Sequence, residues 1–220
     1  MTKTRVIETN EGIQGLATVE NYDILQRNMR DRKMIETKDL IGAGIVKGTV
    51  LEVGPGPGYL GLEWLKATSA TRLTAIDISN NMLKKARDNA RSYELSGRTE
   101  YIHGNAMEMP FADCSFDAVF TNGSLHEWED PILVMNEVYR VLKPGGRFLI
   151  SDLKRDVSLV IRGVMYMTTK PVKMRPGLIS SINAAYTKDE LIAIKNQSKL
   201  ACGEVAVNPF GIKLFGQKES

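Results

Sequence analysis

The chain has 220 residues, 43% of them apolar, which is enough to bury one hydrophobic core, so we expect residues 1–220 to form a single domain. Its 29 basic and 26 acidic residues give a net charge of only +3, which by itself does not indicate nucleic-acid binding. Cys114 and Cys202 form no disulfide framework, no apolar run could span a bilayer, and the N-terminus carries no signal pattern, so we expect a reduced, cytoplasmic protein.

The first two thirds of the chain predict an alternating α/β pattern. Residues 1–45 are polar and charge-rich, with a helical pattern in their second half, and are expected to form an N-terminal helical cap. Over residues 46–152, strands are predicted at 50–53, 73–76, 100–103, 118–121 and 147–151, and helices at 60–67, 80–93 and 131–142. The Pro-Gly-Gly at 144–146 predicts the stop of the last of these helices. Such alternation is typical of parallel strands joined by right-handed crossovers, hence of an α/β sandwich.

The last third breaks the alternation. Residues 154–183 form an insert with no predicted strand. Thr187 and Glu190 then match a capping box, which predicts a helix through about residue 196. We expect that helix and two final strands, at 203–207 and 212–216, to form a C-terminal unit over 184–220.

A glycine-rich turn directly follows the first predicted strand. Gly54, Gly56 and Gly58 stand at alternate positions, immediately before a helical pattern. Glycine lets the backbone turn sharply from strand to helix and lets a ligand lie against the main chain. The pattern therefore predicts a nucleotide-type binding turn, with a simple tight turn as the alternative.

The same turn favours a ligand without phosphate. A dinucleotide fingerprint needs a small residue where this chain has Tyr59. Pro55 and Pro57 also lack the N–H groups that hold a pyrophosphate. An NAD-dependent oxidoreductase is therefore disfavoured, although it stays among the alternatives.

Polar side chains follow the next three strands. Asp77, at the end of the second, is suited to accept both hydroxyls of a ribose, or alternatively to complement the dipole of the next helix. Asn105 follows the third strand, where an amide can meet an adenine edge. Asn122 follows the fourth, at the crevice where α/β sheets bind ligands, with a plain turn residue as the alternative.

Four motifs occur in a characteristic order: Glu52-x-Gly54-x-Gly56-x-Gly58, Asp77, the run MPFADCSFD at 109–117 and LKPGG at 142–146. Together they resemble the class I S-adenosylmethionine-dependent methyltransferases, especially the small-molecule branch that includes the quinone-biosynthesis C-methyltransferases. The resemblance covers about half the chain, roughly 46–152. Asn105 stands where the family usually has aspartate. The Asp/Asn-Pro-Pro-Tyr motif of amino-methylating nucleic-acid enzymes is absent, so we do not expect a nucleic-acid substrate.

The resemblance implies a three-layer Rossmann-like sandwich around a mostly parallel, seven-stranded sheet with an antiparallel last strand. It implies S-adenosyl-L-methionine as cofactor, S-adenosyl-L-homocysteine as product, and no metal. An N-terminal Tyr22-Asp23 pair resembles one that closes over the cofactor, or is a helix-surface pair. The implied cofactor contacts are Glu52, Gly54, Pro55, Gly56, Gly58, Asp77, Ile78, Asn105, Ala106, Met107, Asn122 and Tyr22.

The catalytic residue is left unassigned. Methyl transfer from a sulfonium is an in-line displacement, which an enzyme can accelerate largely by positioning and by excluding water. A base is needed only where the acceptor is protonated. His126 is a weak candidate for that base, and its alternative role lies in the strand-to-helix connection. His103 is expected to be structural.

The insert is expected to choose the substrate. Over 154–175 it carries six basic residues against one acid, with apolar residues between them. One hypothesis is an apolar lid pocket rimmed by positive charge, suited to an anionic or partly apolar small molecule, with contacts from Arg162, Tyr166 and Arg175. The other is an ordinary amphipathic helix with a solvated basic face. A protein or RNA acceptor, a monomer or a homodimer, and a non-catalytic cofactor-binding sensor or accessory role all stay open.

Overall fold

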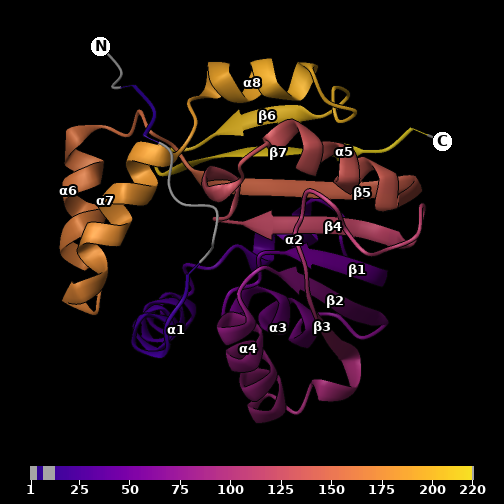
Figure 1. The fold of residues 1–220 in the computed structure, drawn as a ribbon, viewed down its shortest axis with the longest axis horizontal. Helices are drawn as coiled ribbons and strands as arrows, with labels where there is room; N and C mark the ends of the chain where they lie inside the picture. The colour runs from indigo at the N-terminus through magenta and orange to yellow at the C-terminus, as the bar shows by residue number, and fades with distance from the viewer. Residues whose placement is uncertain (1–3, 7–12, 220) are drawn as a thin grey trace.

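In the computed structural model, which describes residues 4–6 and 13–219, seven strands form one sheet in the order β3-β2-β1-β4-β5-β7-β6 (Figure 1). The strands are β1 (Gly48–Val53), β2 (Thr71–Asp77), β3 (Thr99–His103), β4 (Phe116–Asn122), β5 (Leu142–Leu153), β6 (Glu204–Val207) and β7 (Gly211–Gln217). The first five strands pair in parallel with one another, whereas β7 is antiparallel to both β5 and β6. The predicted sheet, with its antiparallel last strand, is confirmed.

Eight α-helices and three short 3-10 helices lie in the described part of the chain. The α-helices are α1 (Leu16–Asp31), α2 (Thr37–Gly42), α3 (Tyr59–Lys66), α4 (Asn80–Ser92), α5 (Pro131–Val141), α6 (Leu159–Thr168), α7 (Arg175–Ala184) and α8 (Lys188–Asn196). The 3-10 helices are η1 (Ser96–Arg98), η2 (Leu125–Glu127) and η3 (Val172–Met174). The capping box predicted at Thr187 and Glu190 is present at the start of α8.

The two faces of the sheet bury different residues because side chains alternate along a strand. In β1, Leu51 and Val53 pack with residues of α5 and α8, while Val50 packs with residues of α2 and α3. A third cluster joins α3 and α4 to the β2–β3 edge. Helices therefore cover both faces, which gives the three-layer Rossmann-like sandwich.

Two expectations need correction. The predicted helix end is confirmed, since α5 ends at Val141, but the next strand begins at Leu142 rather than near residue 147, so residues 144–146 lie within β5. Phe116 pairs with Leu142 but Ala118 pairs with Arg147, so the intervening residues bulge from the ladder, where a proline without an N–H is tolerated. The N-terminal helix also begins earlier than its apolar pattern indicates, at Leu16. The parts of the expected cap at 1–3 and 7–12 lie outside the described residues.

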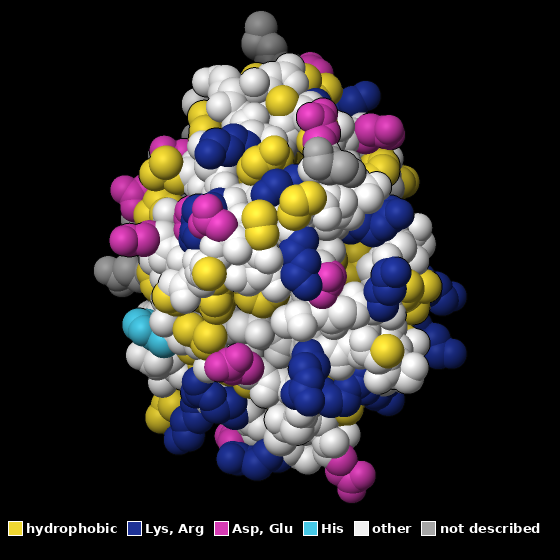
Figure 2. Space-filling model, turned by 90° about the vertical axis from the view of Figure 1, so that its right-hand side faces the viewer, with side chains coloured by type: hydrophobic (Ala, Val, Ile, Leu, Met, Phe, Trp, Pro, Cys, Tyr) yellow, Lys and Arg dark blue, Asp and Glu magenta, His cyan; other side chains and the backbone are white. Residues whose placement is uncertain are grey.

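The carboxyl end of β4 points to the side of the molecule where α1, α6 and α7 lie (Figure 1). On the face at the right of that view, basic, acidic and hydrophobic side chains are interspersed, so charge of one sign does not dominate there (Figure 2). None of the helices among residues 4–6 and 13–219 combines the length and apolar character required to cross a membrane.

Candidate functional site

A cavity of about 540 Å³ lies at the carboxyl ends of β1, β2 and β4. Its volume falls within the roughly 300–1,000 Å³ common for small-molecule pockets. The glycine turn, the ends of β2 and β4, the loop after β3, α1 with the link to α2, and the segment around η2 all contribute to its lining. This is the crevice where open α/β sheets bind ligands.

At each glycine of the turn, a side chain would be unfavourable for a different structural reason. Gly54 has φ 66°, and a Cβ there would lie 2.8 Å from the Ser124 Cβ. Gly56 has φ 54°, and its Cβ would approach the Tyr22 ring at 3.3 Å. Gly58 precedes α3 with φ 85° and lies close to Tyr101, but it does not line the cavity. A side chain at any of them would meet both backbone strain and a close neighbour.

Asp77 is connected to the glycine turn. Its Oδ2 accepts a hydrogen bond from the Gly56 N–H at 3.2 Å, and its Oδ1 accepts one from the Ser79 N–H at 2.8 Å. Burial raises the pKa of Asp77 to about 6, although these two N–H groups act in the opposite direction. Ser79 itself caps α4 by accepting from the Met82 N–H, so the helix has its own cap and the carboxylate faces the cavity.

Glu52 is a buried acid in the cavity wall. It is only 2% exposed, and its Oε2 has no hydrogen-bond partner among the described residues. Burial and, to a smaller extent, the charge of Asp77 raise its pKa to about 8, against the opposing effect of a backbone hydrogen bond from Gly61. An unpartnered buried carboxylate oxygen is costly unless a ligand compensates it, so this wall suits a positively charged ligand group.

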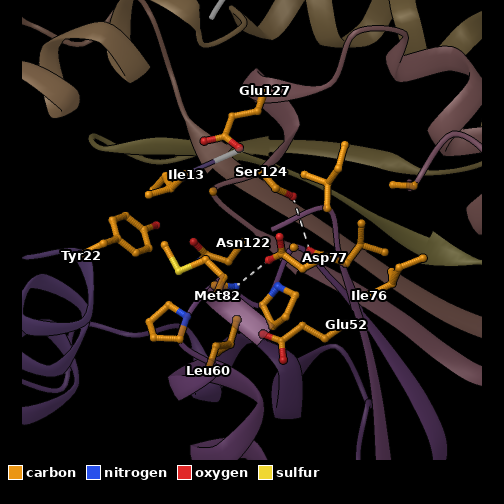
Figure 3. A pocket seen from close by; sticks show the side chains of 18 of the residues that line it. Ile13, Tyr22, Glu52, Leu60, Ile76, Asp77, Met82, Asn122, Ser124 and Glu127 are labelled. Atoms are coloured by element: carbon orange, nitrogen blue, oxygen red, sulfur yellow. Dashed lines mark hydrogen bonds between the residues drawn. The ribbon is translucent and has the colours of Figure 1, made fainter. Parts of the chain in front are cut away.

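The other predicted cofactor contacts also reach the cavity. The Asn105 Oδ1 accepts a hydrogen bond from the Met107 N–H at 2.9 Å, which shapes the loop after β3. Tyr22 enters from α1, and burial raises its pKa to about 12, with the nearby charge of Glu127 contributing. Figure 3 shows Tyr22, Asn122, Asp77 and Glu127 arranged around one space. Pro55, Ile78, Ala106 and Met107 complete the predicted contacts in the lining.

The neighbour of Tyr22 holds α1 against the turn. Asp23 is 3% exposed, and its Oδ1 accepts hydrogen bonds from the Tyr59 hydroxyl and the Asn89 amide, both at 3.0 Å. The Asn89 amide also donates to the Pro57 carbonyl at 2.8 Å. The helix-surface alternative for Tyr22 and Asp23 is therefore wrong, because one lines the cavity and the other is buried.

Sequence reasoning missed two parts of the lining. One comes from α1 and its link to α2: Gln26, Met29, Met34, Ile35 and Glu36. No motif marks these residues. The other comprises Glu127 to Glu129, which follow β4 at the central crevice. That position alone could have indicated that these residues line the cavity. The described lining contains five acids and no lysine, arginine or histidine; the acids are Glu36, Glu52, Asp77, Glu127 and Glu129.

Neither histidine lines the cavity. His126 is 4% exposed, its Nδ1 lies 2.9 Å from Asp152 Oδ1, and its backbone N–H donates to Asp152 Oδ2 at 2.8 Å. These contacts join η2 to β5. The Nε2 of His103 lies 3.1 Å from the Ile78 carbonyl oxygen at an exposed position. A catalytic role for His126 stays a prediction.

The insert also lies outside the cavity lining. Arg162 donates to Asn183 Oδ1 at 3.3 Å, and Arg175 donates to the Met167 carbonyl at 3.1 Å. The Arg175 guanidinium also lies over the Tyr166 ring, 4.9 Å from its centroid. The structure thus brings together the predicted cofactor residues except Gly58, but it does not bring the predicted substrate residues to them.

Three comparisons with known proteins agree with this geometry. Residues 51–150 match the family model described as a methyltransferase domain. The ubiquinone/menaquinone biosynthesis C-methyltransferase of Klebsiella pneumoniae is 34% identical over 117 residues, which are 52% of this chain and 47% of that protein. The match thus spans about half the length of the curated relative.

Two solved structures share the fold over nearly the whole chain. A Methanococcus maripaludis protein assigned to the S-adenosyl-L-methionine-dependent methyltransferases superposes with a TM-score of 0.75 at 22% identity, covering 100% of this chain and 98% of that one. A S-adenosyl-L-methionine-dependent methyltransferase from Aquifex aeolicus gives 0.69 at 19% identity, covering 93% and 99%. At these identities the likeness shows the fold.

Proposed function

We propose that this chain, whose residues 51–150 match a methyltransferase domain, transfers a methyl group from S-adenosylmethionine to a small-molecule acceptor. The observation that carries the proposal is a single cavity that joins the glycine turn, the carboxylate of Asp77 and the unpartnered carboxylate oxygen of Glu52. These groups match a ligand that has ribose hydroxyls and a positive charge and that lacks phosphate.

The residues present fit S-adenosylmethionine. Asp77 would accept the ribose hydroxyls, the loop from Asn105 to Met107 would meet the adenine, and Glu52 would complement positive charge. When bound, the cofactor supplies a methyl group on a sulfonium, which is already reactive toward nucleophiles. The chain then needs to hold the acceptor in line and to exclude water, and Tyr22 on α1 closes one wall of the cavity. No base is required for an acceptor that arrives unprotonated.

The remaining lining bears on the acceptor. Met29, Met34 and Ile35 are apolar, which supports the expectation of a partly apolar molecule. The anionic acceptor that we also expected finds no basic side chain in the described lining, and carboxylates such as Glu127 would repel it. We therefore favour a partly apolar acceptor that is neutral or positively charged.

The test is turnover of S-adenosylmethionine, labelled in its methyl group, by the purified chain with a fractionated extract of small metabolites. Formation of S-adenosylhomocysteine and of one labelled product is expected. Calorimetric binding of S-adenosylmethionine without turnover on any fraction would favour the sensor or accessory alternative. Tight binding of NAD with no binding of S-adenosylmethionine would overturn the proposal.

A further inference from the structure

Helix α6 presents apolar side chains to the solvent. None of its ten residues is buried, and Leu159, Val160 and Met167 are 85%, 76% and 66% exposed. With Gly163 and Val164 these positions follow the i, i+4 spacing of one helix face. A surface helix normally turns its apolar face to the core and its polar face outward, whereas α6 exposes apolar residues in addition to the partly buried Ile161 and Met165.

Helix α6 is held in place by defined hydrogen bonds. The Ser158 hydroxyl caps α6 by accepting a hydrogen bond from the Ile161 N–H at 3.2 Å. On its inner side, Arg162 donates to Asn183 at the end of α7. The one arginine of α6 is thus directed at α7, while the basic residues Lys170 and Lys173 of the insert are exposed after the helix. The outward side is the apolar one.

The chain segment that contains α6 and α7 carries positive charge only. Residues 157–188 contain no aspartate or glutamate, although the chain has 26 of them. Lys170 and Lys173 are exposed just after α6, and Val172 between them is 59% exposed. Among the described residues neither lysine forms an ion pair. Exposed apolar side chains beside such lysines match an anionic lipid surface, because the apolar side chains can enter the headgroup layer and the lysines can meet negative headgroups.

A second copy of the chain fits this surface less well. A two-fold dimer would bring the same patch against itself, and Lys170 and Lys173 would face their own like charges. An anionic bilayer meets the apolar face and the lysines at once. The position agrees, since the Asn28 amide of α1 donates to the Lys170 carbonyl at 3.4 Å, and α6, η3 and α1 lie on the side to which β4 points (Figure 1).

We propose that the outward face of α6, with Lys170 and Lys173, docks this protein onto an anionic lipid bilayer. Docking would place the cavity side of the molecule next to the membrane surface. The proposal is independent of the acceptor's identity and of methyl transfer itself.

The experiment is co-sedimentation of the full chain with vesicles of phosphatidylcholine alone or mixed with phosphatidylglycerol. Binding to the mixed vesicles, weakened by added salt, is expected. Val160→Glu should reduce it by about tenfold, because a charge replaces an inserted apolar side chain. Lys170→Glu combined with Lys173→Glu should reduce it and remove the salt dependence. Leu133→Glu is the matched control, since Leu133 is a 48% exposed apolar residue on α5.

Unchanged S-adenosylmethionine affinity would show that each variant is folded. Absence of binding to the mixed vesicles, or equal losses for Val160→Glu and Leu133→Glu, would overturn the proposal. So would a stable dimer in sedimentation velocity that Val160→Glu dissociates while vesicles leave the wild-type chain in the supernatant. That outcome would assign the face to self-association.

Discussion

The Asn89 side chain on α4 and the Asp23 carboxylate on α1 are joined by a 3.0 Å hydrogen bond, and the same amide donates to the Pro57 carbonyl in the glycine turn. One side chain therefore links the N-terminal helix, the cofactor turn and α4. Since Tyr22 directly precedes Asp23 on α1, its place in the cavity depends on this link.

Replacing Asp23 with alanine should loosen that link. The Tyr59 hydroxyl and the Asn89 amide would lose their acceptor, and we expect the free energy of unfolding to fall by about 2–4 kcal/mol, with weaker S-adenosylmethionine binding. Urea denaturation and calorimetry measure the two effects. Asp31→Ala, at an exposed acid on the same helix, should change stability by less than about 0.5 kcal/mol. Equal losses in both variants would contradict the role of Asp23.

Asp77→Asn should weaken S-adenosylmethionine binding by roughly 10- to 100-fold, because hydrogen bonds to a charged acceptor contribute about 1.5–3 kcal/mol. Calorimetry at neutral pH measures the change. Asp88→Asn serves as control, since that acid lies on the outer side of α4 in an exposed ion pair. Matching affinities for Asp77→Asn and the wild-type chain would remove Asp77 from the cofactor site.

The same carboxylate predicts a pH dependence. The pKa of Asp77 is raised to about 6, so the ligand-free protein gains a proton there as the pH falls through 6. A protonated oxygen can no longer accept from a ribose hydroxyl, and affinity should fall by up to about tenfold per pH unit below that value. Titrations between pH 5 and pH 8 test this. Asp77→Asn should lack the step, and a wild-type affinity that is flat over this range would contradict it.

Glu52→Gln should raise stability at higher pH. The pKa of Glu52 is raised from 4.5 to about 8 in the folded chain, so the folded state holds this proton more tightly than the unfolded state. The stabilisation is complete below about pH 4.5 and is lost as the pH rises to 8, by at most about 1.4 kcal/mol per unit. Glutamine does not ionise and avoids this loss.

Urea denaturation at pH 5 and pH 8 measures the difference between Glu52→Gln and the wild-type chain, which should grow with pH. A constant difference would show that Glu52 is ionised throughout. The same variant should bind S-adenosylmethionine more weakly, because a bound cation favours the ionised form of Glu52, which glutamine cannot adopt.

Gly54→Ala should cost more than an alanine at an equally left-handed glycine elsewhere. Both Gly54 and Gly145 have positive φ, but a Cβ at Gly54 would lie 2.8 Å from Ser124, whereas at Gly145 the nearest atom is the Gln217 side chain at 3.5 Å. We expect an additional loss of about 1–3 kcal/mol for Gly54→Ala, together with loss of cofactor binding. Similar stabilities of the two variants would mean that Ser124 moves aside freely.

The predicted cofactor contacts could be found from the sequence because they lie at the ends of strands that are adjacent in the sheet. Gly54 follows a buried strand and precedes a helix, and Asp77 ends the neighbouring strand. In a parallel sheet the ends of adjacent strands meet at one edge, so recognising two strands and a turn was sufficient to bring these residues together. The helix starts at Ser79 and Thr187 were predictable for the same reason, since a cap involves only residues a few positions apart.

The part of the cavity lining outside the predicted cofactor contacts was not predictable. Met29, Met34 and Glu36 carry no motif, and they reach the cavity because Asp23 is hydrogen-bonded to Tyr59 and Asn89, far away in the chain. Tyr59, which in the sequence argued only against a dinucleotide, became part of that contact.

The insert at 154–183 shows most clearly what could not be predicted from the sequence alone. Its composition of apolar and basic residues is plain in the sequence, but amphipathic spacing does not indicate which face of a helix packs inward. The packing of Arg162 toward Asn183 turned Leu159, Val160 and Met167 to the solvent and away from the cavity. Local sequence was thus sufficient for strands, caps and the cofactor turn, whose interactions span a few residues or adjacent strands. The cavity walls contributed by α1 and its link to α2, and the exposed face of α6, were decided by contacts between distant segments, which only the folded chain brings together.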